Sequence, residues 1–289
     1  MTAAHAFSLL NHGMENPMDR VYRLETFGRI GFAAHGIVYL LVGWFAVRSA
    51  MGLGSPTDTK GALHSLVGGP FGWAMLGAMA LGLLSYALFR LVEALLDLND
   101  HGRDARGMLA RLGRIVSALI HIGLAGYAAA LAIGMTMSGG GMKGWTAWLM
   151  QQPYGPWMVM AAGAIVFGVA VFQAKSAWSA DFMDDLSISG DKRKTAKVVG
   201  CAGRAARAFA FALVAVFLVS AGWNVDASKA GGLADALREL QQQPYGPWLL
   251  GVVAVGFVLF GLSSFVEAAY RRIADENVIN RLRDQATGH

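Results

Sequence analysis

The chain has 289 residues, of which 55% are hydrophobic and only 15% are charged, and its formal net charge is +5. Soluble globular proteins carry about a quarter charged residues. The composition therefore excludes a disordered chain, a collagen-like repeat and an ordinary soluble enzyme, and it indicates a membrane protein with several spans. The basic residues cluster between apolar stretches, which favours anionic lipid headgroups over nucleic acid as partners. The single cysteine, Cys201, excludes an intrachain disulfide and any CxxC motif.

Residues 1–27 contain several charged side chains and no apolar core of a signal peptide. We therefore expect a cytoplasmic N-terminal segment, followed by a first span that acts as its own insertion signal. Six later stretches of at least 18 residues lack Asp, Glu, Lys and Arg. Because about 20 apolar residues cross a bilayer core as a helix, these stretches predict six transmembrane helices. The helices are expected near residues 28–50, 72–97, 110–136, 156–178, 204–223 and 247–271.

The distribution of Lys and Arg predicts the orientation of these spans. The side that holds both termini carries 19 of the 24 Lys and Arg residues, and the opposite side carries five. Because cytoplasmic loops are enriched in Lys and Arg, both termini are expected in the cytoplasm. Seven of the eight tryptophans fall near the outer ends of spans, where indole rings are enriched, and only Trp178 falls near an inner end.

A sequence repeat divides the chain into three similar units. Residues 151–157 are identical to residues 242–248, and residues 69–73 are a weaker copy of the same turn. The opening of the first span, residues 31–36, resembles that of the fifth, residues 203–208. Each unit holds two spans, so all copies have the same orientation, which predicts a pseudo-threefold axis along the membrane normal. The expected fold is an all-α membrane protein of three parallel two-helix repeats, at 28–97, 108–178 and 198–271, with a cytoplasmic tail at 272–289.

A short segment with helical periodicity precedes each proline of the repeated turn. In the third copy Leu233, Ala236 and Leu237 share one face, and polar residues such as Asp235 lie on the other. We expect short interfacial helices on the outer side of the membrane. The proline ends each one, and the glycine permits the turn into the returning span. This unit is either a simple connector or part of a substrate gate.

These motifs resemble a known family. The opening G-x-A-A-[RH]-[GA]-x-x-[YF] of the first and fifth spans, the P-[YF]-G turn and the three hairpins are similar to the family called domain of unknown function 1206. The resemblance covers about residues 24–272 and implies a bacterial integral membrane protein of three two-helix repeats, with no established activity. It therefore implies a multi-pass protein of the bacterial cytoplasmic (inner) membrane. The sequence departs from the family pattern at His35, where arginine is expected, and in the middle repeat, where Ser117 takes that place.

Ionisable side chains inside spans are costly and are hypotheses for functional sites. The repeat alignment sorts the polar residues into two corresponding positions. The first holds His35, Ser117 and Arg207, and the second holds Glu93, Ser176 and Glu267. Where the first member is basic the second is acidic, so we predict that His35 contacts Glu93 and that Arg207 contacts Glu267, near the cytoplasmic interface. Each pair is either a structural staple between two helices or a site that handles protons or ions.

His121 is a second histidine inside a span. It aligns with aromatic residues of the other repeats, which favours a packing role. A bis-histidine haem site with His35 is the alternative, because imidazole is a good axial ligand of haem. The candidate intramembrane polar cluster consists of His35, Glu93, Arg90, His121, Arg207 and Glu267.

Signatures of catalysis are missing: the sequence has no H-E-x-x-H, no G-x-S-x-G and no P-loop. Residues 97–106 resemble the opening of the CDP-alcohol phosphotransferase motif. However, His101 is an extra residue there and the downstream aspartate pair is absent, so a solvated loop is expected. We expect no catalytic, cofactor-binding or metal-binding residues. The function expected is a non-enzymatic membrane scaffold or a small-solute or ion pathway, and the alternative is a membrane-embedded enzyme or haem carrier.

The connector 179–203 ends in a basic run that contains Lys192, Arg193, Lys194 and Lys197. This run either contacts anionic lipids or only marks the cytoplasmic side. The expected partners are the lipid bilayer and anionic lipid headgroups at the cytoplasmic face.

Overall fold

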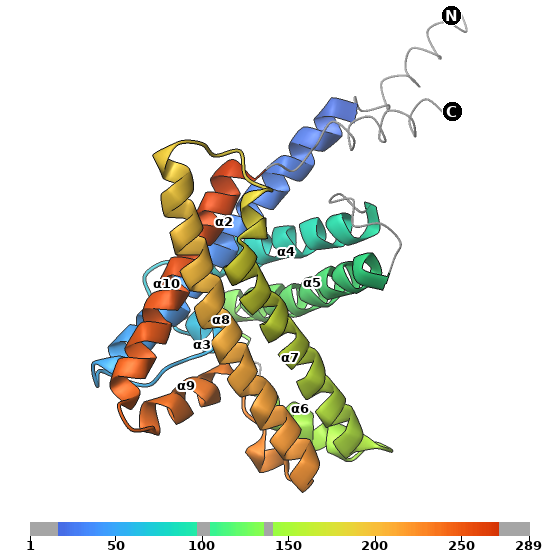
Figure 1. The fold of residues 1–289 in the computed structure, drawn as a ribbon, viewed down its shortest axis with the longest axis vertical. Coiled ribbons are helices and arrows are strands. Elements are labelled where there is room, and N and C mark those ends of the chain that lie inside the picture. Colours follow the sequence, from blue (N-terminus) through green and yellow to red (C-terminus); the bar gives the residue numbers. More distant parts are fainter. Residues whose placement is uncertain (1–16, 97–104, 136–140, 272–289) are drawn as a thin grey trace, which may run out of the picture.

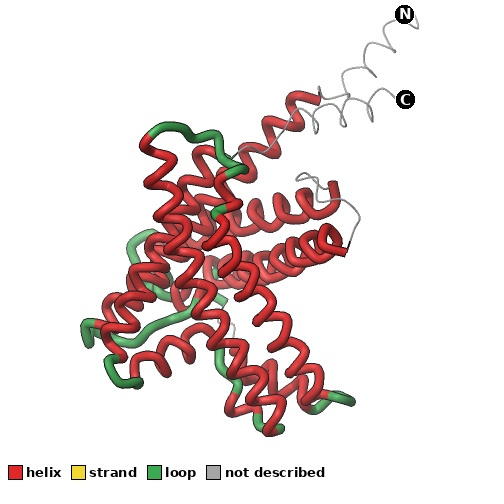
Figure 2. Tube along the Cα trace, in the orientation of Figure 1, coloured by secondary structure: helices red, strands yellow, loops and turns green. Residues whose placement is uncertain are grey.

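A computed structural model describes residues 17–96, 105–135 and 141–271 (Figure 1). These residues form helices joined by loops, and no β-strand occurs among them (Figure 2). Most of the predicted N-terminal segment 1–27, the start of the loop 97–106 and the predicted tail 272–289 lie outside the described residues.

Six long helices form the bundle, and each is long and apolar enough to cross a membrane. They confirm the six predicted spans and make the chain an integral membrane protein. The helices are α2 (Pro17–Ala50), α4 (Gly72–Leu96), α5 (Ala105–Ala132), α7 (Gly155–Ser179), α8 (Asp191–Asn224) and α10 (Gly246–Tyr270). Helices α2 and α8 begin more than ten residues before the predicted spans. The end of the bundle at which α2, α5 and α8 begin and α4, α7 and α10 end is called the basic end below.

Short helices precede the returning spans, as the periodicity predicted. They are α3 (Thr59–His64), α6 (Gly141–Met150) and α9 (Leu233–Gln242), with short 3₁₀ segments η1 (Asp181–Met183) and η2 (Ala227–Lys229) in two connectors. The apolar face of α9 packs on the bundle, where Leu237 and Leu240 join the core with Val42 of α2. Gln241 of α9 also exchanges two hydrogen bonds with Ser49 of α2, at 2.9 and 3.1 Å. Helix α9 therefore ties the third repeat to the first.

The repeated turn has the same backbone in all three copies. Phe71, Tyr154 and Tyr245 adopt left-handed conformations with φ of 59°, 61° and 61°. The glycine that follows permits the turn through close approach, since a Cβ at Gly246 would lie 2.1 Å from the carbonyl oxygen of Gln241. A bulkier residue there would prevent the chain from folding back on the short helix.

The most extensive packing joins the second helix of one repeat to the first helix of the next. These pairs are α4 with α5, α7 with α8, and α10 with α2. Figure 1 shows the three pairs, with α4 and α5 running across the direction of α7 and α8. Because α10 packs on α2, the third repeat contacts the first repeat in the same way as each repeat contacts the next.

The first and third repeats share the same internal contacts. A Cβ at Gly31 would lie 2.6 Å from the backbone of Tyr86, and a Cβ at Gly203 would lie 2.5 Å from the backbone of Phe260. These residues correspond in the repeat alignment. The absence of a side chain therefore lets α2 approach α4, and α8 approach α10, at the same point.

The second repeat differs from the other two. Its helices α5 and α7 do not pack extensively against each other and instead pack on α4 and α8. The sequence is also most divergent here, with Ser117 and Ser176 at positions that are charged or histidine in the other repeats. The prediction of three similarly packed hairpins therefore describes the first and third repeats better than the second.

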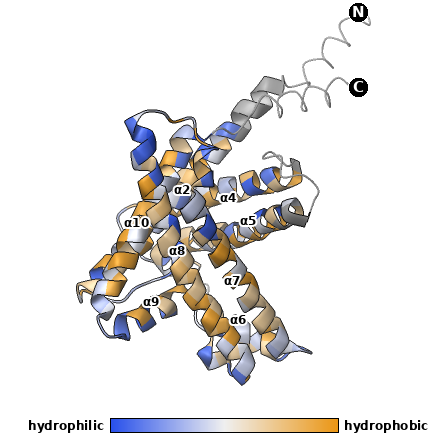
Figure 3. Ribbon diagram, in the orientation of Figure 1, coloured by the Kyte–Doolittle hydropathy of each residue, from blue (hydrophilic) through white to orange (hydrophobic). Residues whose placement is uncertain are grey.

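The long helices are largely apolar (Figure 3), and large apolar side chains such as Ile120, Phe172 and Val252 are exposed on them. Exposed tryptophans at the end of the bundle opposite the basic end include Trp73, Trp157 and Trp248, which follow the repeated turn, whereas Trp178 is exposed at the basic end. This is the distribution that a bilayer requires, with indole rings at the level of the headgroups.

Candidate functional site

Two glutamates lie buried at the basic end, at corresponding positions of α4 and α10. Glu93 is 2% exposed and Glu267 is 6% exposed. Each carboxylate accepts charge-assisted hydrogen bonds from arginines: Arg90 donates to Glu93 at 2.8 Å, and Arg204 donates to Glu267 at 2.8 Å. Ionised carboxylates at this depth require such partners, because desolvation of a lone charge is costly.

Arg271, at the end of α10, connects both glutamates. Its Nη1 donates to Glu267 and its Nη2 donates to Glu93, each at 2.9 Å. The same Nη2 lies 3.1 Å from Oδ2 of Asp185, in the connector between α7 and α8. One guanidinium therefore joins α4, α10 and the connector at the basic end.

The connector that carries Asp185 packs against the bundle through its backbone and its apolar side chains. Leu186 forms an isolated antiparallel bridge with Arg271, and the amide of Ser187 donates to the carbonyl of Tyr270 at 2.8 Å. Phe182 is buried, and its ring lies 3.5 Å from the guanidinium carbon of Arg204. Burial raises the pKa of the Asp185 carboxyl above its ordinary value, although the nearby Arg271 opposes the change.

A second layer lies about one helical turn deeper in the bundle. The His35 ring stacks on Tyr86 with a centroid distance of 4.7 Å and an interplanar angle of 4°. Its Nδ1 lies 3.3 Å from the hydroxyl of Ser264. That hydroxyl donates to the carbonyl of Phe260, so it accepts from His35 Nδ1. The other ring nitrogen, His35 Nε2, is buried without a hydrogen-bond partner among the described residues.

His121 lies beside His35, with ring centroids 5.3 Å apart. Its Nδ1 is 2.7 Å from the carbonyl oxygen of Ser117, so this nitrogen is protonated and donates. The His35 ring is also packed against Tyr39 and Phe260, at centroid distances of 4.9 and 5.7 Å. Aromatic side chains thus occupy the space around His35 that a porphyrin would need, and this packing does not support the haem alternative.

Arg207 lies among aromatic rings. Its guanidinium carbon is 4.8 Å from the ring centroids of Phe211 and Phe260 and 5.2 Å from that of Tyr39. Its Nε is buried without a hydrogen-bond partner within the described part of the chain. Cation–π contacts offset part of the desolvation of this charge, but no carboxylate pairs with it there.

The predicted contacts of the two pairs are wrong. The residue that reaches Glu267 is Arg204, one turn nearer the basic end than Arg207, and His35 contacts Ser264 and aromatic rings instead of Glu93. The three side chains of the second layer lie too deep in the bundle to meet carboxylates at its end.

Four contributors to the cluster were not predicted: Arg114, Arg204, Asp185 and Arg271. Arg114 lies 3.8 Å from Glu93, and the repeat alignment places it at the same position as Arg204. That correspondence, one turn before Ser117 and Arg207, was visible in the sequence. The position of Asp185 and Arg271 depends on how the connector folds, which no repeat encodes. We call Arg90, Arg114, Arg204, Arg207 and Arg271, with Glu93, Glu267 and Asp185, the arginine cluster.

The sequence was compared with known families and proteins. The family described as Domain of Unknown Function (DUF1206) matches three times, at residues 30–97, 112–180 and 202–271. The chain belongs to this family. A relative in Bacillus subtilis (strain 168), described as uncharacterized protein YxxB, is 31% identical over 256 residues, which cover 88% of this chain and 93% of the relative. No solved structure matches. The three matches confirm the three repeats, and the family description indicates no specific activity.

Proposed function

We propose that this DUF1206 protein is a non-enzymatic protein of the bacterial cytoplasmic membrane that binds small anions and forms a pathway for them. The observation that carries the proposal is the position of Arg207. The four other arginines of the cluster contact its three carboxylates, whereas the Arg207 guanidinium lies among aromatic rings and its Nε has no hydrogen-bond partner within the described residues. A partly buried guanidinium without a carboxylate favours the binding of an anion that supplies the missing negative charge.

Arg207 and His35 are the residues that we assign to the anion. Both have a buried nitrogen without a hydrogen-bond partner in the described residues, and both pack against Tyr39 and Phe260. A guanidinium donates readily to carboxylate, phosphate or halide. A neutral His35 presents a lone pair at Nε2 and becomes a donor when it is protonated. Binding of an anion beside Arg207 would therefore favour uptake of a proton by His35.

The contacts of Arg271 support a closed conformation at the basic end. Its guanidinium holds Glu93, Glu267 and Asp185 together, and these residues come from α4, α10 and the connector. In the proposed pathway the anion reaches Arg207 from the basic end only when this contact opens. The opposite half of the bundle is packed with apolar side chains such as Val42, which would form the second barrier.

The proposed orientation rests on charge. In the predicted topology, the side that holds both termini carries 19 of the 24 Lys and Arg residues of the sequence, as cytoplasmic segments do. Reporter fusions test it directly. Fusions after residue 190 are expected to report the cytoplasm and fusions near residue 230 the outside, and the reverse result would contradict the orientation.

Anion binding is tested with purified protein in detergent. Phosphate, chloride and acetate are each titrated while the midpoint of thermal unfolding is followed, because a ligand that binds only the folded state raises it. We expect at least one anion to raise the midpoint of the wild type and of Arg207→Lys, and to raise that of Arg207→Gln much less. Arg48→Gln is the matched control, since Arg48 is exposed near the far end of α2.

Transport is tested in proteoliposomes with the anion that binds. Uptake by the wild type should exceed that of empty liposomes and should fall in Arg207→Gln but not in Arg48→Gln. If no anion stabilises the wild type, the proposal is wrong, and a lower stability of Arg207→Gln would then give Arg207 a structural role. Binding without uptake would favour a scaffold that holds an anion.

A further inference from the structure

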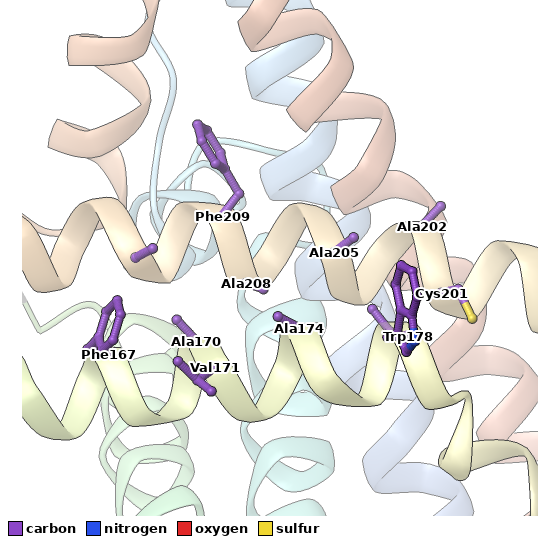
Figure 4. Close-up of a pocket in the computed structure, with 12 residues that line it drawn as sticks. Phe167, Ala170, Val171, Ala174, Trp178, Cys201, Ala202, Ala205, Ala208 and Phe209 are labelled. Carbon is purple, nitrogen blue, oxygen red and sulfur yellow. The ribbon is translucent and has the colours of Figure 1, made fainter.

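An apolar groove runs along the outer face of helices α7 and α8 (Figure 4). Its volume is about 600 Å³, and it is open to the side. Phe167, Ala170 and Ala174 of α7 face Ala205, Ala208 and Ala212 of α8 across it. The small alanine side chains leave this space open. The lining is almost entirely apolar, and its polar groups are the indole N–H of Trp178 and the thiol of Cys201.

The length of the groove matches the length of one lipid chain in one leaflet. On α8 it extends from Ala212 to Cys201, which is about 16 Å at a rise of about 1.5 Å per residue. Half of a hydrocarbon core of about 30 Å has the same thickness. Trp178, which is 93% exposed, lines the groove at the level of Cys201, where an interfacial indole is expected.

Beyond this end, α8 continues as one helix and presents lysines. Lys194 precedes Cys201 by seven residues, about two turns, so it lies on the face that forms the groove. Lys197 precedes Cys201 by about one turn and lies at the edge of the same face. Both are exposed, and Lys194 Nζ has only a 4.0 Å contact with the exposed Asp191 among the ion pairs described. Along the helix axis, Lys197 would lie roughly 6 Å and Lys194 roughly 10 Å beyond Cys201, which is the level of the lipid headgroups.

We propose that this groove is a binding site for an anionic phospholipid. One acyl chain lies between α7 and α8, and the phosphate contacts Lys194 and Lys197. Charge complementarity selects the lipid class, since a zwitterionic headgroup carries its own cation and gains less from the two lysines. The site is separate from Arg207 and His35, so it stands or falls independently of the proposed anion pathway.

The test is native mass spectrometry of purified protein with equal amounts of phosphatidylglycerol and phosphatidylcholine that have identical acyl chains. We expect the wild type to retain phosphatidylglycerol preferentially. Each of Lys194→Gln and Lys197→Gln should reduce that preference, by about five-fold per lysine. Lys192→Gln is the matched control, because Lys192 is exposed on the opposite face of the same helix, about two and a half turns before Cys201.

The groove itself is tested by filling it. Ala205→Phe should reduce retention of both lipids, whereas Ala161→Phe, at an exposed position of α7 away from the groove, should not. Equal retention by the wild type and Ala205→Phe would overturn the proposal. So would the loss of an oligomer in Ala205→Phe without a change in bound lipid, because the groove would then hold a second copy of the chain.

Discussion

Glu267 provides the sharpest test of the arginine cluster. Its carboxylate accepts hydrogen bonds from Arg204 at 2.8 Å and from Arg271 at 2.9 Å, and the side chains of all three are less than a tenth exposed. Glu267→Gln keeps the shape of the side chain but removes its charge and leaves two buried guanidiniums short of a partner. Loss of one partner of a buried pair costs about 3–5 kcal/mol. We expect about 3 kcal/mol, since the amide oxygen of glutamine still accepts one hydrogen bond.

The control is an ion pair of the same length on the surface. Arg238 donates to Asp235 at 2.9 Å, but the two side chains are 50% and 32% exposed. Asp235→Asn should cost less than about 1 kcal/mol, as exposed pairs do. The measurement is the free energy of SDS-driven unfolding in mixed micelles, followed by tryptophan fluorescence. If Glu267→Gln costs no more than Asp235→Asn, burial does not give this cluster its stability.

A double-mutant cycle separates direct contact from general damage. Arg204→Met and Glu267→Gln are measured singly and together, and a coupling energy above about 1 kcal/mol is expected for residues in contact. Arg207→Met combined with Glu267→Gln is the comparison cycle, and it should show less coupling because the structure places Arg204 and not Arg207 at the carboxylate. Strict additivity in the first cycle would contradict the observed ion pair.

Two further predictions concern helix packing and pH. Gly163→Ala should destabilise the protein by about 1–3 kcal/mol in the same unfolding assay, because the new Cβ would lie 2.8 Å from Val219; Gly168→Ala, with nothing within 4 Å, should not. Burial raises the pKa of Asp185, so this group makes the folded state less stable as pH rises from its ordinary value, about 3.9, through the raised one. As pH rises above 4, the stability of the wild type relative to that of Asp185→Asn should therefore fall, and a rise would contradict this reasoning.

The helical frame could be predicted from the sequence because its signals are local or repeated. Six apolar stretches gave the spans, and the heptapeptide at 151–157 and 242–248 gave the turns. Periodicity also gave the short helices, although α9 packs on α2 through Gln241 and Ser49. That contact joins residues 192 positions apart, and no local pattern encodes it.

The pairing of charges could not be predicted in the same way. The alignment gave the correct carboxylates but the wrong cation, because it compared positions within a helix and not their levels in neighbouring helices. A shift of one turn, about 5.4 Å, decides whether Arg204 or Arg207 meets Glu267. Because an arginine side chain is long and flexible, residue spacing alone does not show which of two arginines one turn apart reaches a given carboxylate.

The repeated frame holds a cluster that is not itself repeated, and this difference bears on function. Three equivalent staples would need three equivalent ion pairs, yet the second repeat has Ser176 where the others have Glu93 and Glu267. Both glutamates are instead joined by Arg271, whose counterpart in the second repeat is Ala180. A single arginine at the end of α10 therefore closes the basic end of the bundle. Release of that one side chain would break its contacts with both glutamates and with Asp185 at once, while Arg90 would still hold Glu93 and Arg204 would still hold Glu267. In the proposed pathway to Arg207, we therefore expect the end of α10 to move first.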